Sequence, residues 1–461
     1  MEERTIDFKN CIRPMLHQLD TTGVVYIGAD RVYRRISPDA RDITLELLNS
    51  GLFKELVERR LLPETWIEEK TENSLVLGHK KADFILYASE WTFSMLKKEV
   101  LTLIEVHKVC EKHGWFLQDG HLWNVVFFGD DPMLVDFGSL KKGKAEPDWP
   151  FFKELVANAF FPLLLLSGGD FYMANLILSD TYPNRLQPFP TFSNAPVYFE
   201  KLKVFRKKRD LQYWFGFFCN LFLIPFPPLR KYQFKIWRYR TLRNPAVCEV
   251  QREAEKLQPP KVWTEWDAYH EPNYSDGEVS SRFLRIIELL KSIDWTTAVD
   301  LAGNGGYFTM QVLKNFPEAK MLCLDYDSRA IERAYTRNVT AEEPYKNLTC
   351  GMVNFCYPSD GHIPLSGRIS SDLVIALAVT HHLFLRQSIS SEVFFDFLHD
   401  TSKKYLAIEF MPLGLWREGV APPVPAWYTE EWFRKELDRR FAVIVREQLE
   451  ENRVFFLCHR R

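Results

Sequence analysis

The chain has 461 residues, more than a single hydrophobic core usually holds, so two or three domains are expected. Aromatic residues make up 15% of the sequence and the formal net charge is −2, which excludes a molecule built as a whole to bind polyanions. The eight cysteines contain no Cys-x-x-Cys pair and the N-terminus, MEERTIDFKN, has no signal pattern, so we expect a cytoplasmic protein without a zinc site or disulfide framework.

The first half alternates short strands with helices. Residues 24–36 predict two strands around a Gly-Ala-Asp turn, and residues 42–60 predict a helical region. Residues 91–114 carry apolar side chains at helical spacing and end at Gly114, a common residue after a helix C-terminus. Residues 151–169 are apolar on all sides and predict a buried helix. Together these elements predict an α+β domain over residues 1–200.

A stretch between these helices, LQDGHLWNVVFFGDDPMLVDFGSL (117–140), combines two acids with an asparagine. Asp119 precedes Asn124 by five positions, and Asp136 follows twelve later in an Asp-Phe-Gly triplet. This spacing resembles aminoglycoside- and protein-kinase-type phosphotransferases, in which the first acid lies near the acceptor hydroxyl and the other two side chains hold Mg²⁺ against ATP. The resemblance implies a kinase-like domain, with ATP and Mg²⁺ as further cofactors if the site is active.

Other parts of a phosphotransferase are absent from the sequence. No glycine-rich phosphate cover precedes the trio, and Arg34 and Arg35 stand where a strand lysine is expected, although arginine does not replace lysine conservatively. We therefore favour a degenerate kinase-like module that positions substrate. The alternative for residues 117–140 is a hairpin whose polar residues only cap their neighbours.

Residues 201–243 mix Phe, Trp and Tyr with Lys and Arg; we call this segment the basic aromatic belt. Its apolar run 213–229 is too short and too rich in proline to span a bilayer. Such a mixture suits peripheral contact with anionic lipid at the inner face of the membrane, stacking on nucleic-acid bases, or a helical hairpin buried against the first domain. Residues 251–263 then predict a polar linker, so residues 201–258 form a separate segment.

Strand-like apolar runs alternate with helical patterns beyond residue 259, at residues 293–306, 319–330, 370–383 and 403–414. This rhythm predicts βαβ units and an open parallel sheet, hence an α/β domain over residues 259–461. The first strand enters a glycine-rich turn, VDLAGNGG, in which Asp300 precedes the glycines and can hold an ammonium group. The next strand ends at Asp325, an acid that can accept hydrogen bonds from a ribose diol.

The motifs DLAGNGG, LDYD, LVIALAVTHHL and AIEFMP resemble, in this order, bacterial Rossmann-like class I methyltransferases related to the NoeA host-specific nodulation protein. SGLFKELVERRLL, LQDGHLWNVVF and PMLVDFGSL extend the resemblance into the first half. It implies S-adenosyl-L-methionine as cofactor, with a binding site made of Asp300, Ala302, Gly303, Asn304, Gly306, Asp325, Tyr326, Asn354, Phe355, Tyr269 and Tyr274. The chain departs from the family in the order of Ala302 and Gly303, and in Asn354 where an acid is commoner.

Methyl transfer needs positioning of the acceptor and a place for its proton. His381 or His382, at the end of the fourth strand, is the expected general base because the histidine pKa lies near neutrality. Glu409, at the end of the fifth strand, is expected either to orient that histidine or to act as base. The alternative is that these side chains only pack and cap.

The function expected from this sequence is O-methylation of a glycan, glycolipid or surface-polysaccharide acceptor, where the sugar rests on the family resemblance alone. One alternative is a bifunctional enzyme that phosphorylates and then methylates a polysaccharide terminus. Another is a non-catalytic pseudokinase scaffold at the membrane. An RNA methyltransferase is disfavoured because the net charge is near zero and no RNA-binding module is recognisable.

Overall fold

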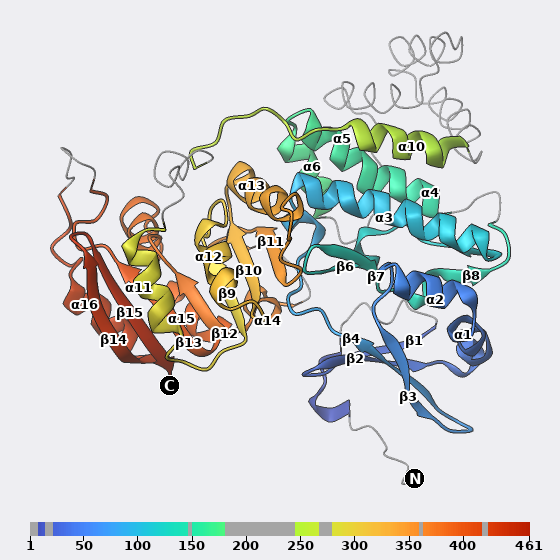
Figure 1. Cartoon of the computed structure of the whole chain (residues 1–461), viewed down its shortest axis with the longest axis horizontal. Helices are drawn as coiled ribbons and strands as arrows, with labels where there is room; N and C mark the ends of the chain where they lie inside the picture. Colours follow the sequence, from blue (N-terminus) through green and yellow to red (C-terminus); the bar gives the residue numbers. More distant parts are fainter. Residues whose placement is uncertain are drawn as a thin grey trace. The chain divides into compact units, whose positions relative to one another are not determined.

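A computed structural model describes residues 8–13, 22–145, 150–179, 245–266, 279–358, 363–416 and 423–461 (Figure 1). The basic aromatic belt therefore lies outside the described residues, as do Tyr269 and Tyr274. The chain divides into two compact units, each made of more than one stretch of the sequence. Unit 1 comprises residues 1–81, 93–126 and 131–261, and unit 2 comprises residues 82–92, 127–130 and 262–461.

Unit 1 contains a four-stranded antiparallel sheet in the order β1-β2-β4-β3. Its strands are β1 (Gly23–Ile27), β2 (Arg31–Ile36), β3 (Thr65–Lys70) and β4 (Leu75–Lys80). Two helices, α1 (Arg41–Leu48) and α2 (Gly51–Glu58), connect β2 to β3. The predicted helical region is broken between them because Ser50 caps α2, its hydroxyl accepting a hydrogen bond from the Phe53 amide.

The rest of unit 1 is mostly helical around the long helix α3 (Phe93–Lys112). Short strands follow it: β5 (Trp115–Leu117), β6 (Val125–Phe128), β7 (Asp131–Leu134) and β8 (Leu140–Lys142). The predicted buried helix is present as α4 (Pro150–Glu154), a π-helical turn (Leu155–Phe160) and α5 (Phe161–Ser167), and α6 (Phe171–Leu178) comes next. By length and composition residues 150–167 could cross a membrane, but 65% of that stretch is buried within the protein, as in a core helix.

The expected linker at residues 251–263 is partly wrong, because α10 (Pro245–Lys256) occupies its first half. Val247, Val250 and Ala254 are buried on one face of α10, at the spacing of a helix that packs against a neighbour. The Lys97 ammonium of α3 donates hydrogen bonds to the carbonyls of Glu255 and Leu257, at 2.7 and 2.9 Å. The helix therefore belongs to unit 1.

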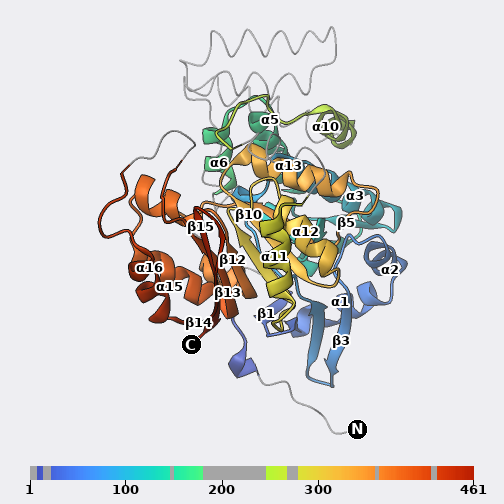
Figure 2. The same cartoon turned by 60° about the vertical axis from the view of Figure 1, so that its left-hand side comes forward.

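Unit 2 is built on a seven-stranded sheet in the order β11-β10-β9-β12-β13-β15-β14 (Figure 2). The first five strands in this order are parallel, and β15 runs antiparallel to both of its neighbours. The strands are β9 (Thr297–Leu301), β10 (Lys320–Asp325), β11 (Leu348–Met352), β12 (Ser371–Ala376), β13 (Ser402–Phe410), β14 (Phe441–Glu450) and β15 (Arg453–Arg460). The predicted Rossmann-like α/β fold of the C-terminal part is confirmed.

Helices precede, connect and follow the parallel strands of unit 2, since each parallel pair needs a crossover connection. They are α11 (Ser281–Leu290), α12 (Tyr307–Asn315), α13 (Ser328–Val339), α14 (Leu365–Arg368), a π-helix (His382–Arg386), α15 (Ser391–Thr401) and α16 (Glu430–Asp438). The central strands are almost fully buried on both faces, with Val299, Leu322 and Ile375 at 0% exposure. The carboxyl ends of β9, β10, β11 and β12 therefore meet at one edge of a rigid sheet.

Candidate functional site

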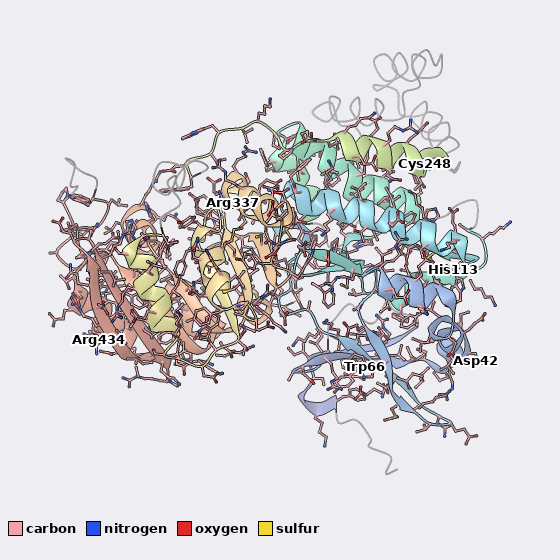
Figure 3. All side chains as sticks on the ribbon, in the orientation of Figure 1. Asp42, Trp66, His113, Cys248, Arg337 and Arg434 are labelled. Atoms are coloured by element: carbon pink, nitrogen blue, oxygen red, sulfur yellow. The ribbon has the colours of Figure 1, made fainter. Side chains whose placement is uncertain are left out.

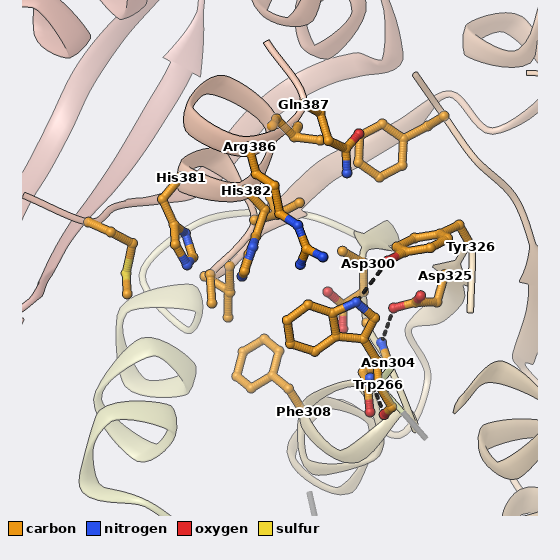
Figure 4. Close-up of a pocket in the computed structure, with 18 of the residues that line it drawn as sticks. Trp266, Asp300, Asn304, Phe308, Asp325, Tyr326, His381, His382, Arg386 and Gln387 are labelled. Carbon is orange, nitrogen blue, oxygen red and sulfur yellow. Dashed lines mark hydrogen bonds between the residues drawn. The ribbon is translucent and has the colours of Figure 1, made fainter. Parts of the chain in front are cut away.

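A cavity of about 790 Å³ lies at this carboxyl edge within unit 2 (Figure 4). Strand order reverses at β9, because β10 and β11 extend the sheet on one side and β12 and β13 on the other. Open α/β sheets bind ligands at such a switch point. Ten of the predicted site residues line the cavity: Asp300, Ala302, Gly303, Asn304, Asp325, Tyr326, Asn354, Phe355, His381 and His382.

The glycine-rich turn between β9 and α12 forms the floor of this site. Ala302 and Asn304 both have positive φ angles, 59° and 50°, in the left-handed region that favours glycine. Gly303 is needed for space, because a Cβ there would lie 2.6 Å from the Cys323 sulfur. Gly306 is predicted to bind the cofactor but does not line the cavity; with φ of 71° it begins α12 instead.

The turn is also tied to α13 from outside. The Arg337 guanidinium of α13 (labelled in Figure 3) donates a 3.1 Å hydrogen bond to the Gly305 carbonyl. The amide of Gly303 bonds the Leu324 carbonyl of β10 at 2.9 Å. Both contacts fix the turn before any ligand arrives.

Two buried acids face the cavity from adjacent strands. Asp300, at the end of β9, accepts a 2.6 Å hydrogen bond from the Thr309 hydroxyl, and burial raises its pKa to about 7. Asp325, at the end of β10, accepts hydrogen bonds from the backbone amides of Asn304 and Asp327, each at 2.8 Å. Burial likewise raises the pKa of Asp325 to about 6. Each carboxyl retains acceptor capacity toward the cavity, since a carboxylate offers about four lone-pair sites.

Trp266 is the main cavity residue that the sequence analysis did not single out. Its indole Nε1 donates a 2.8 Å hydrogen bond to the Tyr326 hydroxyl, and its carbonyl accepts one from the Asn304 amide group at 3.0 Å (Figure 4). On the other side, its ring meets the His382 ring edge to face, with centroids 5.0 Å apart. Trp266 lies three residues before Tyr269, which the family resemblance assigns to the cofactor site, so the sequence pointed to this region but not to Trp266 itself.

The two histidines lie next to each other on the side of the cavity opposite Asp325 and Tyr326 (Figure 4). Their ring centroids are 4.1 Å apart, and His381 is buried. Burial, followed by the charges of His382 and Arg453, lowers the pKa of His381 to about 3. His381 is therefore a neutral imidazole at physiological pH, able to accept a hydrogen bond but weak as a proton acceptor.

Glu409 lies at the end of β13, where the sequence analysis placed it, but its partners are not the histidines. Its carboxylate is fully buried and accepts two 2.9 Å hydrogen bonds from Arg282 and one of 3.1 Å from Arg453. It also accepts a 3.0 Å hydrogen bond from the Ala378 amide. A carboxylate held by two guanidinium groups is a poor base, so the geometry argues against that role. Glu409 instead anchors the loop that leads to the histidines.

Arg282 and Arg453 had no sequence signal, because neither lies in a recognisable motif. Both also face Glu450, with the Nε atom of Arg453 2.9 Å and that of Arg282 3.5 Å from its carboxylate. Two arginines and two glutamates therefore form a charge-balanced group, and both arginines line the cavity.

Unit 1 brings the Asp119, Asn124 and Asp136 trio together around Ser139. The serine hydroxyl contacts Asp136 at 2.5 Å, Asp119 at 3.3 Å and the Asn124 amide at 3.4 Å. Burial and the nearby Asp136 raise the pKa of Asp119. The trio thus forms a real cluster, consistent with but not specific to a phosphotransferase site.

Arg34 alters the chemistry of this cluster. It is a buried residue of β2, its guanidinium lies 3.9 Å from the Asp136 carboxylate, and it donates a 3.1 Å hydrogen bond to the Val135 carbonyl. Arg34 therefore places a fixed positive charge beside Asp136, from the strand on which the sequence analysis expected a lysine. Among the described residues, no group of three or more His, Cys, Asp or Glu side chains could hold a metal ion. The role of Asn124 and Asp136 as metal ligands stays a prediction.

No family model matches the chain. Among curated proteins, the chain is similar to the nodulation protein NoeA of Rhizobium meliloti (strain 1021), with 23% identity over 421 residues. The matched region covers 85% of this chain and 83% of NoeA. Among solved structures, the chain is similar to magnesium protoporphyrin IX methyltransferase from Synechocystis PCC 6803 with bound SAM, at 15% identity over 43% of this chain and 92% of that one, with a TM-score of 0.32. It is also similar to the N-methyltransferase NodS from Bradyrhizobium japonicum WM9, at 15% identity over 41% and 98% of the two chains, with a TM-score of 0.29.

Proposed function

We propose that this protein is a methyltransferase that uses S-adenosyl-L-methionine and acts on an oxygen of a glycan or glycolipid. The observation that carries the proposal is the convergence of four strand ends on one cavity. There, two buried acids and a glycine turn lie opposite a pair of histidines. A buried carboxylate ahead of the glycines suits a cationic amino-acid group better than a phosphate, because buried charges are paired with charges of opposite sign.

The residues present fit this cofactor in size and in chemistry. A volume of about 790 Å³ is within the range of roughly 300–1,000 Å³ that small-molecule sites occupy. Asp300 would bind the ammonium group and Asp325 the ribose diol. Asn354 and Phe355 would meet the edge and face of the adenine, and Gly303 lets the backbone approach closely. When bound, the cofactor supplies a methyl group on a sulfonium, an electrophile that the protein need not activate further.

The protein's remaining tasks are to orient the acceptor hydroxyl, exclude water and receive one proton. His382 is the better candidate for the proton because His381 is more deeply buried and has a strongly lowered pKa. The His382 imidazole would receive the hydroxyl proton while the cofactor supplies the methyl group to the oxygen and leaves as S-adenosylhomocysteine. His381 would accept a hydrogen bond from a neighbouring hydroxyl group of the substrate.

The balance of arginine and glutamate charges beside the cavity favours an uncharged hydroxyl over a phosphate as the methyl acceptor. Arg282 and Arg453 are neutralised by Glu409 and Glu450, so no net positive charge is left for an anion. Aromatic and apolar walls, including Trp416 and Met411, suit the apolar face of a sugar ring. The choice of a carbohydrate acceptor rests on the family resemblance given in the sequence analysis.

For unit 1 we propose a kinase-like module that positions substrate and does not transfer phosphate. The arginine at the place of the expected strand lysine supports this reading over the bifunctional alternative. The basic aromatic belt would place the enzyme peripherally at the cytoplasmic face of the membrane. Flotation of the full chain with anionic vesicles, but not with neutral ones, is the expected result for such contact. Equal behaviour with both would contradict it.

The methyltransferase proposal is tested by calorimetry with S-adenosylhomocysteine (SAH), the demethylated product. We expect micromolar binding to the wild type that Asp325→Ala abolishes. The matched control is Asp294→Ala, since Asp294 is 93% exposed in its side chain and should leave binding unchanged. If the wild type does not bind SAH, the catalytic proposal fails and the scaffold alternative is left.

A further inference from the structure

Two short segments of the N-terminal half are built into unit 2. We call residues 82–92 the capping segment and residues 127–130 the capping turn; both belong to the compact unit that carries the cavity. Strand β11 is the terminal strand of the sheet and is hydrogen-bonded only to β10 among the described strands. A terminal strand of this kind has an unprotected edge unless another part of the chain packs there.

The capping segment is fastened by a buried ion pair. The Arg368 guanidinium makes two 2.7 Å hydrogen bonds to the two carboxylate oxygens of Glu90, and both residues are almost fully buried. Arg368 also donates to the Ile85 carbonyl at 2.8 Å, and its backbone carbonyl accepts from the Ile85 amide at 3.2 Å. The Tyr87 ring covers the guanidinium at 3.9 Å. Such a fork-to-fork pair fixes orientation as well as distance.

The capping segment and the capping turn both press directly on β11. Leu86 packs closely on Gly351: a Cβ atom added to Gly351 would lie 2.7 Å from Cδ1 of Leu86. Gly129 of the capping turn has φ of 66°, and a Cβ on it would lie 1.9 Å from the Lys346 carbonyl. Asp130, which is buried, pairs with the Lys346 ammonium at 3.1 Å. Both segments therefore contact β11 or the residues that lead into it.

Strand β11 continues into the cavity. Val353, Asn354 and Phe355 follow its last residue and line the site. The Val353 amide bonds the Asp325 carbonyl at 2.8 Å, which sets the end of β11 in register with the end of β10. A shift of β11 would therefore move the adenine-side residues relative to Asp325.

We infer that the capping segment and the capping turn are positioning elements for the adenine end of the cofactor site, contributed by the N-terminal half. The identity of the ligand in this inference rests on the proposed function, whereas the contacts on β11 do not depend on it. Residues 262–461 alone would lack the contacts that hold β11 in place, so the methyltransferase unit is not a contiguous piece of sequence.

The test is Leu86→Ala in the full chain, with two readouts. The first is hydrogen exchange of the peptide covering residues 348–355, which we expect to accelerate. The second is the dissociation constant for SAH, which we expect to rise by about 2- to 30-fold, the range for residues coupled to a site without touching its ligand. Leu86→Val is the milder variant if the alanine variant does not fold.

The matched control is Leu52→Ala, which removes an equally buried leucine from α2 of unit 1. It should lower the melting temperature without changing exchange at residues 348–355 or SAH binding. The inference is overturned if both variants change the two readouts equally, or if Leu86→Ala changes neither. If the wild type fails to bind SAH, the proposed function falls, and exchange at residues 348–355 still decides whether these segments position β11.

Discussion

Replacing Asp300 with asparagine should separate the cost of a buried acid from its use in binding. The carboxyl is fully enclosed, and burial raises its pKa to about 7 from a usual 3.8. Asn keeps the shape and can still accept the Thr309 hydrogen bond, but it cannot ionise. The variant therefore removes one titration and one prospective negative charge with little change in packing.

The raised pKa of Asp300 makes the stability of the ligand-free protein depend on pH. Between pH 4 and pH 7 Asp300 holds a proton in the folded chain but loses it in the unfolded chain. The contribution of Asp300 to stability is therefore complete below about pH 4 and lost as pH rises through about 7. The difference from 3.8 corresponds to roughly 4 kcal/mol of unfolding free energy as an upper bound, at about 1.4 kcal/mol per pKa unit.

The affinity for SAH should depend on pH in the opposite direction to the stability. It should rise with pH, because the ammonium group of SAH favours the ionised carboxyl of Asp300. Wild-type affinity should fall by about tenfold for each pH unit below 7, where Asp300 must first lose its proton. Asp325 adds to this dependence below about pH 6. Loss of the charged hydrogen bond in Asp300→Asn should cost about 1.5–3 kcal/mol of binding, or roughly 10- to 150-fold in affinity.

The assay is urea unfolding between pH 5 and pH 8, combined with SAH calorimetry over the same range. We expect the wild type to lose more stability than Asp300→Asn as pH rises, and only the wild type to bind SAH tightly at pH 8. Asp294→Asn, on the exposed surface, is the control and should match the wild type. An equal loss of stability in wild type and Asp300→Asn, or undiminished SAH binding by the variant, would refute the reasoning.

Three further predictions follow from contacts in the two units. Gly303→Ala should destabilise the fold by about 1–3 kcal/mol and remove SAH binding in calorimetry, because its Cβ would lie 2.6 Å from the Cys323 sulfur; normal affinity would contradict the proposed close approach. Glu409→Gln should lower unfolding free energy in urea by about 3–5 kcal/mol, since two buried guanidiniums lose their shared anion. The pH profile of methyl transfer should keep its shape in that variant; loss of its acidic limb, where a general base becomes protonated, would restore Glu409 as the base. ATP with Mg²⁺ should give no thermal shift in the wild type, and a shift that Asp136→Asn abolishes would establish a nucleotide site in unit 1.

Motifs at the ends of strands were predicted well because they are local. Asp300 and Asp325 each directly follow a run of apolar residues, so their place at the carboxyl edge followed from the strand pattern. Parallel strands bring such ends together whatever the details of packing. The same logic predicted the two histidines after β12. The contacts of Trp266 with Tyr326 and His382 had no such signal and are known only from the structure.

The partners of Glu409 could not be predicted in this way. Arg282 lies 127 positions before it and Arg453 lies 44 positions after it. No periodicity links these residues, and an acid at a strand end has the same sequence signature whether it is a base or an ion-pair anchor. The same holds for Arg34, whose approach to Asp136 depends on the packing of β2 against a distant turn.

By itself the sequence determined the alternation of strands and helices, the glycine turn and the acids and histidines at the cavity edge. These features follow from short-range periodicity and from steric rules that act within a few residues. Only the tertiary structure decided which charges are neutralised, and that residues 82–92 and 127–130 pack against β11 in unit 2. Those outcomes depend on pairs such as Glu90 and Arg368, 278 positions apart, which no short-range sequence pattern connects.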